Sequence, residues 1–248
     1  MKLKFVTCSG ANEHTSIKEM LKLSWDYPQI EFGIQVCGAK GGAGSSRRDW
    51  LIKLIRTISR FDDDMLPHLA LHINKDWVES CGAGICPEDL TFLLRAYNHR
   101  YSKIFKRVQL NFKIGRDKCP DMQSLEKIIN SYSQEFILSY NESNADYINE
   151  MKNRGKARFV CLYDDSHGEG IIPEKRKSPA FDDVEQGYAG GLSPDNVVQE
   201  LEKINLVVPE KTRIWIDAEG KLKGEDGHLS IDKCREFIDK ALTWEASH

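Results

Sequence analysis

Residues 3–37, LKFVTCSGANEHTSIKEMLKLSWDYPQIEFGIQVC, contain the pattern from which the fold can be deduced. A short apolar run typical of a strand, Leu3–Cys8, is followed by an amphipathic run of helical length, Ser16–Tyr27, and then by a second strand-like run, Glu31–Cys37. Two strands joined through a helix pair in parallel, with a right-handed crossover. The stretch therefore predicts one strand–helix–strand unit.

The same alternation continues along the rest of the chain. Further strand-like runs lie at His68–Asn74, Arg107–Phe112, Glu135–Tyr140, Arg158–Asp164, Gly187–Gly190 and Arg213–Asp217. Further helix-like runs lie at Ser46–Ser59, Pro87–Tyr101, Met122–Ser133, Ala145–Asn153, Pro194–Asn205 and Ile231–Trp244. Eight strands that alternate with helices predict an α/β protein, a (β/α)8 TIM barrel with a single domain over residues 1–248. An open doubly wound sheet is the alternative, but its first turn is usually rich in glycine, and here that turn contains only Gly10.

Composition excludes several classes of protein. The 35 Lys and Arg residues are balanced by 38 Asp and Glu residues that are mixed along the chain, which does not suit a general nucleic-acid-binding surface. No apolar run approaches the roughly 18 residues of a membrane span, and the first residues do not resemble a signal peptide. Seven scattered cysteines suit reduced thiols. We therefore expect a cytoplasmic protein, monomeric or homodimeric, with a small-molecule substrate and no nucleic-acid or membrane partner.

Polar residues at the carboxyl ends of the predicted strands are the first candidates for chemistry, because these positions open onto the working face of a barrel. The first strand ends in Cys8, the sixth in Asp164 and the eighth in Asp217. A thiol and a carboxylic acid whose pKa values are separated by their surroundings can transfer protons. The alternative is that Cys8 is a small buried apolar residue and that the carboxylates cap loops.

Two glycine-rich loops are candidates for anion binding. Gly168 and Gly170 follow the sixth strand, and Gly190 and Gly191 follow the seventh. Glycine allows the backbone to approach a phosphate closely, and barrels often hold a phosphate near these loops. The alternative is a tight connection from strand to helix. The basic run at 175–177 predicts a mobile surface loop, with a lid as one option.

The stretch Ala189–Val197, AGGLSPDNV, resembles the alanine-glycine-glycine-leucine, asparagine-proline-glutamate-asparagine-valine stretch of the phosphoribosylanthranilate isomerase family, the barrel of the tryptophan pathway. Other segments are similar to that family in the same order along the chain: Phe5–Asn12, Phe32–Val36, Ser45–Arg48, Val108–Asn111, Leu162–Asp164 and Gly227–Ile238.

This resemblance implies an intramolecular oxidoreductase of tryptophan biosynthesis, an aldose–ketose isomerase that acts on a sugar phosphate without a metal or a cofactor. By the same resemblance, Cys8 is the general base and Asp164 the general acid, with the neighbouring Asp165 as the alternative acid. Arg47 or Arg48 would hold a substrate carboxylate, and Asp217 would contact the aromatic amine of the substrate. The resemblance also assigns Gly190 and Gly191, with Gly168 and Gly170, to the phosphate.

The chain departs from the family pattern where the phosphate would bind. Glu169 and Glu219 stand in loops where the family has small neutral residues. Repulsion from each carboxylate would weaken the binding of a phosphate dianion by about 1 kcal/mol. The loops Gly38–Ser45 and Asn74–Cys86 are also long. Two alternatives follow: a related barrel enzyme that acts on a different or non-phosphorylated sugar-like ligand, and an inactive barrel that serves as a binding or scaffold protein.

A zinc site can be imagined from Cys81, Cys86, His68 and His72. A structural zinc site needs four ligands in closely spaced pairs, and two histidines four residues apart on a strand lie far from each other. We therefore expect no metal.

Overall fold

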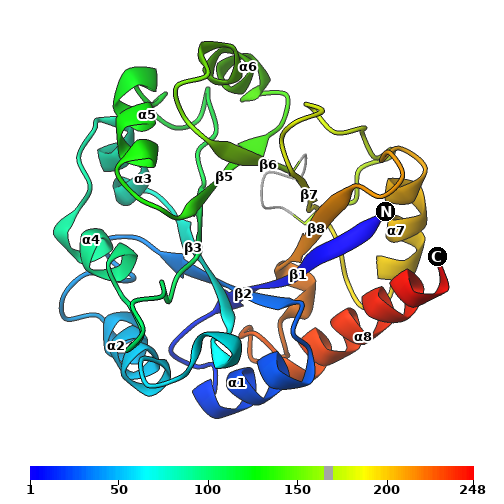
Figure 1. The fold of residues 1–248 in the computed structure, drawn as a ribbon, viewed down its shortest axis with the longest axis horizontal. Coiled ribbons are helices and arrows are strands. Elements are labelled where there is room, and N and C mark those ends of the chain that lie inside the picture. Colours follow the sequence, from blue (N-terminus) through cyan, green and yellow to red (C-terminus); the bar gives the residue numbers. More distant parts are fainter. Residues whose placement is uncertain (165–169) are drawn as a thin grey trace. The chain divides into compact units, whose positions relative to one another are not determined.

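The computed structural model describes residues 1–164 and 170–248. Within these residues, eight strands close into a barrel in sequence order, which confirms the predicted (β/α)8 fold (Figure 1). The strands are β1 (Lys2–Ala11), β2 (Ile30–Val36), β3 (His68–Ile73), β4 (Arg107–Leu110), β5 (Glu135–Tyr140), β6 (Phe159–Tyr163), β7 (Gln186–Tyr188) and β8 (Arg213–Ala218).

Helices follow the strands except between β6 and β7, where the described residues contain none, and two short helices lie between β3 and β4. The α-helices of the described residues are α1 (Ile17–Asp26), α2 (Ser46–Ile58), α3 (Asp76–Gly82), α4 (Glu88–Leu94), α5 (Met122–Asn130), α6 (Ala145–Arg154), α7 (Val197–Asn205) and α8 (Ile231–Ser247). Two single-turn 3₁₀ helices, η1 (Asp63–Met65) and η2 (Gly220–Leu222), complete the elements. In the described residues no helix is long and apolar enough to cross a membrane.

Side-chain caps explain where several helices begin. Ser16, Ser45, Asp121 and Ser230 each accept a hydrogen bond from a backbone N–H in the first turn of α1, α2, α5 and α8. Such a cap satisfies one of the N–H groups that have no partner inside the helix. Helix α6 ends at Gly155, whose φ of 61° is the left-handed conformation that favours glycine.

The chain divides into two compact units, which we call the terminal unit, Met1–Gly33 with Val160–His248, and the central unit, Ile34–Phe159. The single domain predicted for residues 1–248 stays a prediction.

In the terminal unit, β8 pairs in parallel with both β1 and β7, and Thr7 lies opposite Asp217. Helix α8 packs against β1, α1 and α7 (Figure 1). The indole of Trp215 covers Gly187, because a Cβ built on that glycine would lie 2.1 Å from Cε2 of Trp215. Since Trp215 and Asp217 are two residues apart on β8, they share one face of the strand. A large apolar ring therefore lies on the same side of the sheet as the carboxylate.

In the central unit, β4 pairs in parallel with β3 and β5, and His72 lies opposite Gln109. Helix α3 packs against α5, and it occupies part of the segment that the sequence predicts as a long loop. The helix predicted over Pro87–Tyr101 is shorter and ends at Leu94.

The side chain of Asn98 explains why that helix ends early. Its Oδ1 accepts hydrogen bonds from the backbone N–H groups of Arg100 and Ser102, and its Nδ2 donates to the carbonyl of Phe61 and to Asp63. Asparagine competes in this way with the hydrogen bonds of a helix. The segment after α4 is therefore a loop organised around one buried amide.

Candidate active site

Three strands bring four polar side chains of the terminal unit together: Thr7 and Ser9 from β1, Asp217 from β8 and Glu31 from the start of β2. The hydroxyl of Ser9 donates a hydrogen bond of 2.6 Å to Oδ1 of Asp217, and the hydroxyl of Thr7 donates one of 2.9 Å to Oε1 of Glu31. All four residues are buried. Because side chains alternate along a strand, Thr7 and Ser9 share one face of β1, and Cys8 points to the other.

Asp217 is the residue of this group whose acidity is most altered. Burial raises its pKa to about 8, and the negative charges of Glu219, Glu31 and Asp164 add to the shift, while the hydrogen bond from Ser9 opposes it. Burial has this effect because a charged carboxylate loses its hydration in an apolar surrounding. Asp217 therefore holds a proton at neutral pH and can donate it.

Cys8, the predicted general base, is fully buried on the opposite face of β1. Its thiol lies within hydrogen-bond reach of the thiol of Cys234 on α8. Burial raises the pKa of Cys8 well above its usual value, and Cys234 and Asp217 raise it further. A thiol in this position stays protonated, and only the thiolate is an effective base. The base role of Cys8 stays a prediction, but its surroundings are unfavourable for that role.

Asp164 and Glu219 lie close enough to Asp217 for their charges to raise its pKa. Asp164 directly follows β6 and is half-buried. The carboxylate of Glu219 lies 3.6 Å from the ammonium group of Lys223, an ion pair that leaves both side chains partly exposed. Of the predicted site residues, Asp164 and Asp217 are thus near enough to interact electrostatically, and their catalytic roles stay predictions. Asp165, the alternative acid, lies outside the described residues, as do Gly168 and the neighbouring Glu169.

The glycine turn after β7 is tightly packed. Gly190 and Gly191 have φ values of 87° and 68°, and a Cβ on Gly191 would lie 2.9 Å from the carbonyl oxygen of Gly170 and 2.5 Å from Cγ1 of Ile172. The space beside Gly191 is thus taken by segment 170–172. The phosphate role of Gly170, Gly190 and Gly191 stays a prediction.

Arg176 belongs to the run 175–177, for which the sequence predicts a mobile loop, yet its side chain makes several contacts. Its side chain is buried, it pairs with Glu200 at 2.8 Å, and it donates hydrogen bonds to the carbonyl oxygens of Ala189 and Gly190. A planar guanidinium with several donors suits this role. Arg176 therefore holds the glycine turn against α7.

Arg47 and Arg48 both make contacts inside the central unit. Arg47 is buried and donates to the carbonyl of Gln35 at 2.8 Å. Arg48 pairs with Asp89 and lies over the ring of Phe92, 4.7 Å from its centroid. Their role in holding a substrate carboxylate stays a prediction.

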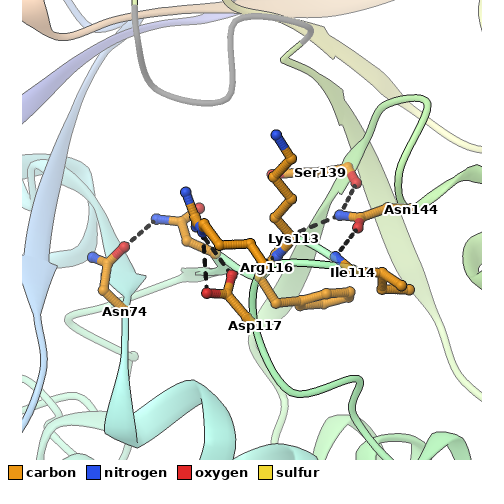
Figure 2. Close-up of polar contacts among 9 residues, drawn as sticks. Asn74, Lys113, Ile114, Arg116, Asp117, Ser139 and Asn144 are labelled. Carbon is orange, nitrogen blue, oxygen red and sulfur yellow. Dashed lines mark hydrogen bonds and ion pairs between the residues drawn. The ribbon is translucent and has the colours of Figure 1, made fainter.

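A pocket of about 420 Å³ opens in the central unit near the carboxyl ends of β2, β3 and β4, and we call it the central pocket. Its charged lining residues are Lys40, Lys75, Arg116 and Lys118, with Glu79 and Asp117. Asn74 and Asn111 also line it, joined by a hydrogen bond of 3.0 Å. Figure 2 shows Asn74 on one side of the Arg116–Asp117 pair and Lys113 on the other.

Asn144 fixes the loop that carries these groups. It is fully buried, its Nδ2 donates to the carbonyls of Phe112 and Ser139, and its Oδ1 accepts from the N–H of Ile114 (Figure 2). Asp117 closes the turn by accepting from the N–H of Lys113. A buried amide with these bonds holds the loop between β4 and β5 in one conformation.

The sequence analysis missed the central pocket, although a pattern in the sequence could have indicated it. Asn74 directly follows β3, and Asn111 directly follows β4. The rule that polar residues at strand ends face the working side of a barrel applies to both. Among the described residues, no three His, Cys, Asp or Glu side chains are grouped so that they could hold a metal ion.

Comparison with known proteins gives relationships of structure only. No family model and no curated protein matches the sequence. TrpF from Jonesia denitrificans is 12% identical, with a TM-score of 0.58 over 98% of this chain and 99% of that one. N-(5'-phosphoribosyl)anthranilate isomerase from Pyrococcus furiosus is 13% identical, with a TM-score of 0.53 over 96% and 98%. A monomeric form of the enzyme from Thermotoga maritima is 15% identical, with a TM-score of 0.51 over 98% and 99%. At these identities the likeness establishes the barrel fold.

Proposed function

We propose that this chain is an enzyme that interconverts the aldose and ketose forms of a sugar phosphate by acid–base catalysis, as the resemblance to phosphoribosylanthranilate isomerase implies. The observation that carries the proposal is Asp217, a buried carboxylic acid at the carboxyl end of a barrel strand with a pKa raised to about 8. Catalysis by proton transfer is most efficient when the pKa of the acid lies near the working pH. The three isomerase structures with the same fold support this proposal.

The proposed reaction uses two carboxyl groups. Asp164, as the carboxylate, removes the proton from C2 of the aldose while Asp217 donates its proton to the carbonyl oxygen on C1, which gives an enediol. Asp164 then returns a proton to C1, and the carboxylate of Asp217 takes back the proton of the hydroxyl on C2, which gives the ketose. The charge of Asp164 already acts on Asp217 in the structure. Two carboxyl groups with different surroundings can fill the two roles.

This assignment moves Asp164 from acid to base. The sequence analysis gave the base role to Cys8, whose thiol is buried against Cys234 and whose pKa is raised. Of the two groups, a half-buried carboxylate that follows β6 is better placed to accept a proton than a buried thiol.

The test is proton exchange measured by NMR. The full chain is incubated in D₂O with a panel of aldose and ketose phosphates and with the same sugars without phosphate, and deuterium at C1 and C2 is followed. We expect incorporation with one class of substrate, and we expect Asp217→Asn to lower the rate by about 10²-fold or more. The control is Asp232→Asn, since Asp232 is an exposed carboxylate in the first turn of α8. Equal rates for the wild type and Asp217→Asn would overturn the proposal.

The same panel tests the alternative of a non-phosphorylated sugar. Glu219 near Asp217 and the pairing of Arg176 with Glu200 favour that alternative, because both make the terminal unit less attractive to a dianion. Exchange with free sugars that exceeds exchange with their phosphates would favour it over the sugar-phosphate isomerase.

A further inference from the structure

The lining of the central pocket carries more positive than negative charge. Four of its lining residues are cationic and two are anionic, and Arg116 and Asp117 form a two-point ion pair with each other. In the described part of the chain, the ammonium groups of Lys40, Lys75 and Lys118 have no hydrogen bond or ion pair. A concave surface lined by one sign of charge concentrates ligands of the opposite sign. The pocket is therefore suited to an anion.

Two of the lining residues, Asn74 and Asn111, belong to a chain of amides that continues behind the pocket to Gln109. Gln109 donates from Nε2 to Oδ1 of Asn111 at 2.7 Å, and Asn111 donates from Nδ2 to Oδ1 of Asn74 at 3.0 Å. Gln109 is only 6% exposed, and within the described residues its Oε1 has no hydrogen-bond partner. On the facing strand position, Nε2 of His72 is also without a partner among those residues. Buried polar atoms of this kind need a partner such as a ligand or a bound water.

The chemistry of these groups narrows the class of ligand. Three separate ammonium groups suit a phosphate monoester, which carries close to two negative charges and three terminal oxygens. The amide oxygens of the lining residues Asn74 and Asn111 each accept one hydrogen bond and can accept a second, from a donor that a phosphate dianion lacks and a hydroxyl group supplies. The pocket volume of about 420 Å³ lies in the range of small-ligand pockets.

We propose that the central pocket binds a hydroxylated phosphate monoester. Lys40, Lys75 and Lys118 contact the phosphate oxygens, and the amides of Asn74 and Asn111 contact the hydroxyl groups. This site consists of residues of the central unit alone, and its ligand binding requires no turnover, so it stands independently of the function proposed above.

The proposal is tested by titration calorimetry on the full chain. The probes are glycerol 3-phosphate, inorganic phosphate, glycerol and malate, a hydroxylated dicarboxylate. We expect glycerol 3-phosphate to bind more tightly than inorganic phosphate, glycerol not to bind, and the affinity for the ester to fall as salt is added. Tighter binding of malate than of glycerol 3-phosphate would overturn the assignment to a phosphate ester.

Variants connect the binding to the pocket. Lys40→Gln, Lys75→Gln and Lys118→Gln each remove one exposed charge, and we expect each to weaken binding of the ester about fivefold. Lys127→Gln on α5 is the matched control, because Lys127 is exposed and does not line the pocket. Asn74→Ala is expected to reduce the preference for the ester over inorganic phosphate. A variant that combines the three lysine substitutions and keeps the wild-type affinity for the ester would overturn the proposal. A loss of affinity in Lys127→Gln equal to that in the single pocket variants would also overturn it.

Discussion

The hydroxyl of Ser9 donates a hydrogen bond of 2.6 Å to the carboxyl group of Asp217, across the pairing of β1 with β8. Two opposing influences set the acidity of Asp217. Burial and neighbouring carboxylates raise the pKa of Asp217, whereas the hydrogen bond from Ser9 lowers it. A hydrogen bond donated to the charged form of an acid favours that form. Ser9 therefore keeps a buried acid within the range where it can both give and accept a proton.

Asp217 is expected to make stability depend on pH. The folded protein holds this proton up to about pH 8, while the unfolded chain releases it near pH 4. The stabilising contribution is therefore complete below about pH 4 and is lost as the pH rises to 8, by at most about 1.4 kcal/mol per pH unit. Asp217→Asn removes this dependence. Urea unfolding at pH 5 and pH 8 should show the wild type losing about 2 kcal/mol or more relative to the variant. Parallel changes would contradict the pKa of about 8.

Cys8 and Ser9 should respond differently to substitution. Cys8→Ser changes a side chain that packs against Cys234, so we expect lower stability and a proton-exchange rate within about threefold of the wild type. Ser9→Ala removes the hydrogen bond to Asp217, so the pKa of Asp217 should rise. The alkaline limb of the pH–rate profile should then shift to higher pH. A loss of 10²-fold or more in Cys8→Ser would restore Cys8 as the base.

The repeated alternation of strand and helix was sufficient to predict the barrel, because each predicted strand has a counterpart in the structure. Helix α3 was not predicted, since a helix of seven residues is too short to show a clear apolar period. The end of α4 was misplaced because Asn98 forms its loop through contacts with Phe61 and Asp63, which are distant in sequence. Local propensity does not contain such contacts.

The candidate site was predicted only in part, for a related reason. Strand alternation alone separates Cys8 from Thr7 and Ser9, but it does not say which face meets the helices. The contact of Cys8 with Cys234 of α8, which is far along the chain, shows that the Cys8 face of β1 meets the helices. Asp217 was predicted as a candidate from its place at a strand end, but the raised pKa on which its proposed role as an acid rests depends on burial that the sequence does not display.

Removal of one partner of the ion pair between Arg176 and Glu200 should destabilise the fold more than removal of both partners. Both side chains are almost completely buried, at 2% and 3% exposure. Among the described residues, Arg176→Met leaves Glu200 buried with Lys203 as its remaining charged partner, and we expect a loss of about 3 kcal/mol in the free energy of unfolding. The double variant with Glu200→Leu should recover much of that loss. Urea unfolding measures both, and a double variant less stable than Arg176→Met would contradict this view.

Cys86 should be the most reactive thiol at mildly acidic pH. Hydrogen bonding to Cys81 lowers its pKa, with further contributions from Thr91, Tyr132 and Arg95. Cys119 is exposed and serves as the reference thiol. Iodoacetamide labelling at pH 6.5, followed by peptide mass spectrometry, should modify Cys86 first. Tyr132→Phe should slow the labelling, and equal labelling of Cys119 and Cys86 would contradict this prediction.

Backbone strain at Lys75 is expected to lower the free energy of unfolding, while the side chain of Lys75 contributes a positive charge to the central pocket. Its φ of 54° and ψ of −130° resemble the first central position of a type II′ turn, which glycine occupies without strain. Lys75→Gly should therefore raise the free energy of unfolding by about 1 kcal/mol and the melting temperature by about 2–4 °C, since relief of strain outweighs the added freedom of the unfolded chain. The same change should weaken binding of glycerol 3-phosphate about fivefold, because it removes one of the cations in the pocket. Lys75→Gln is the matched control: it should lose the same affinity without the gain in melting temperature. A Lys75→Gly variant that melts below the wild type would show that the lysine backbone is not strained, and one that binds the ester as tightly as the wild type would remove Lys75 from the anion site.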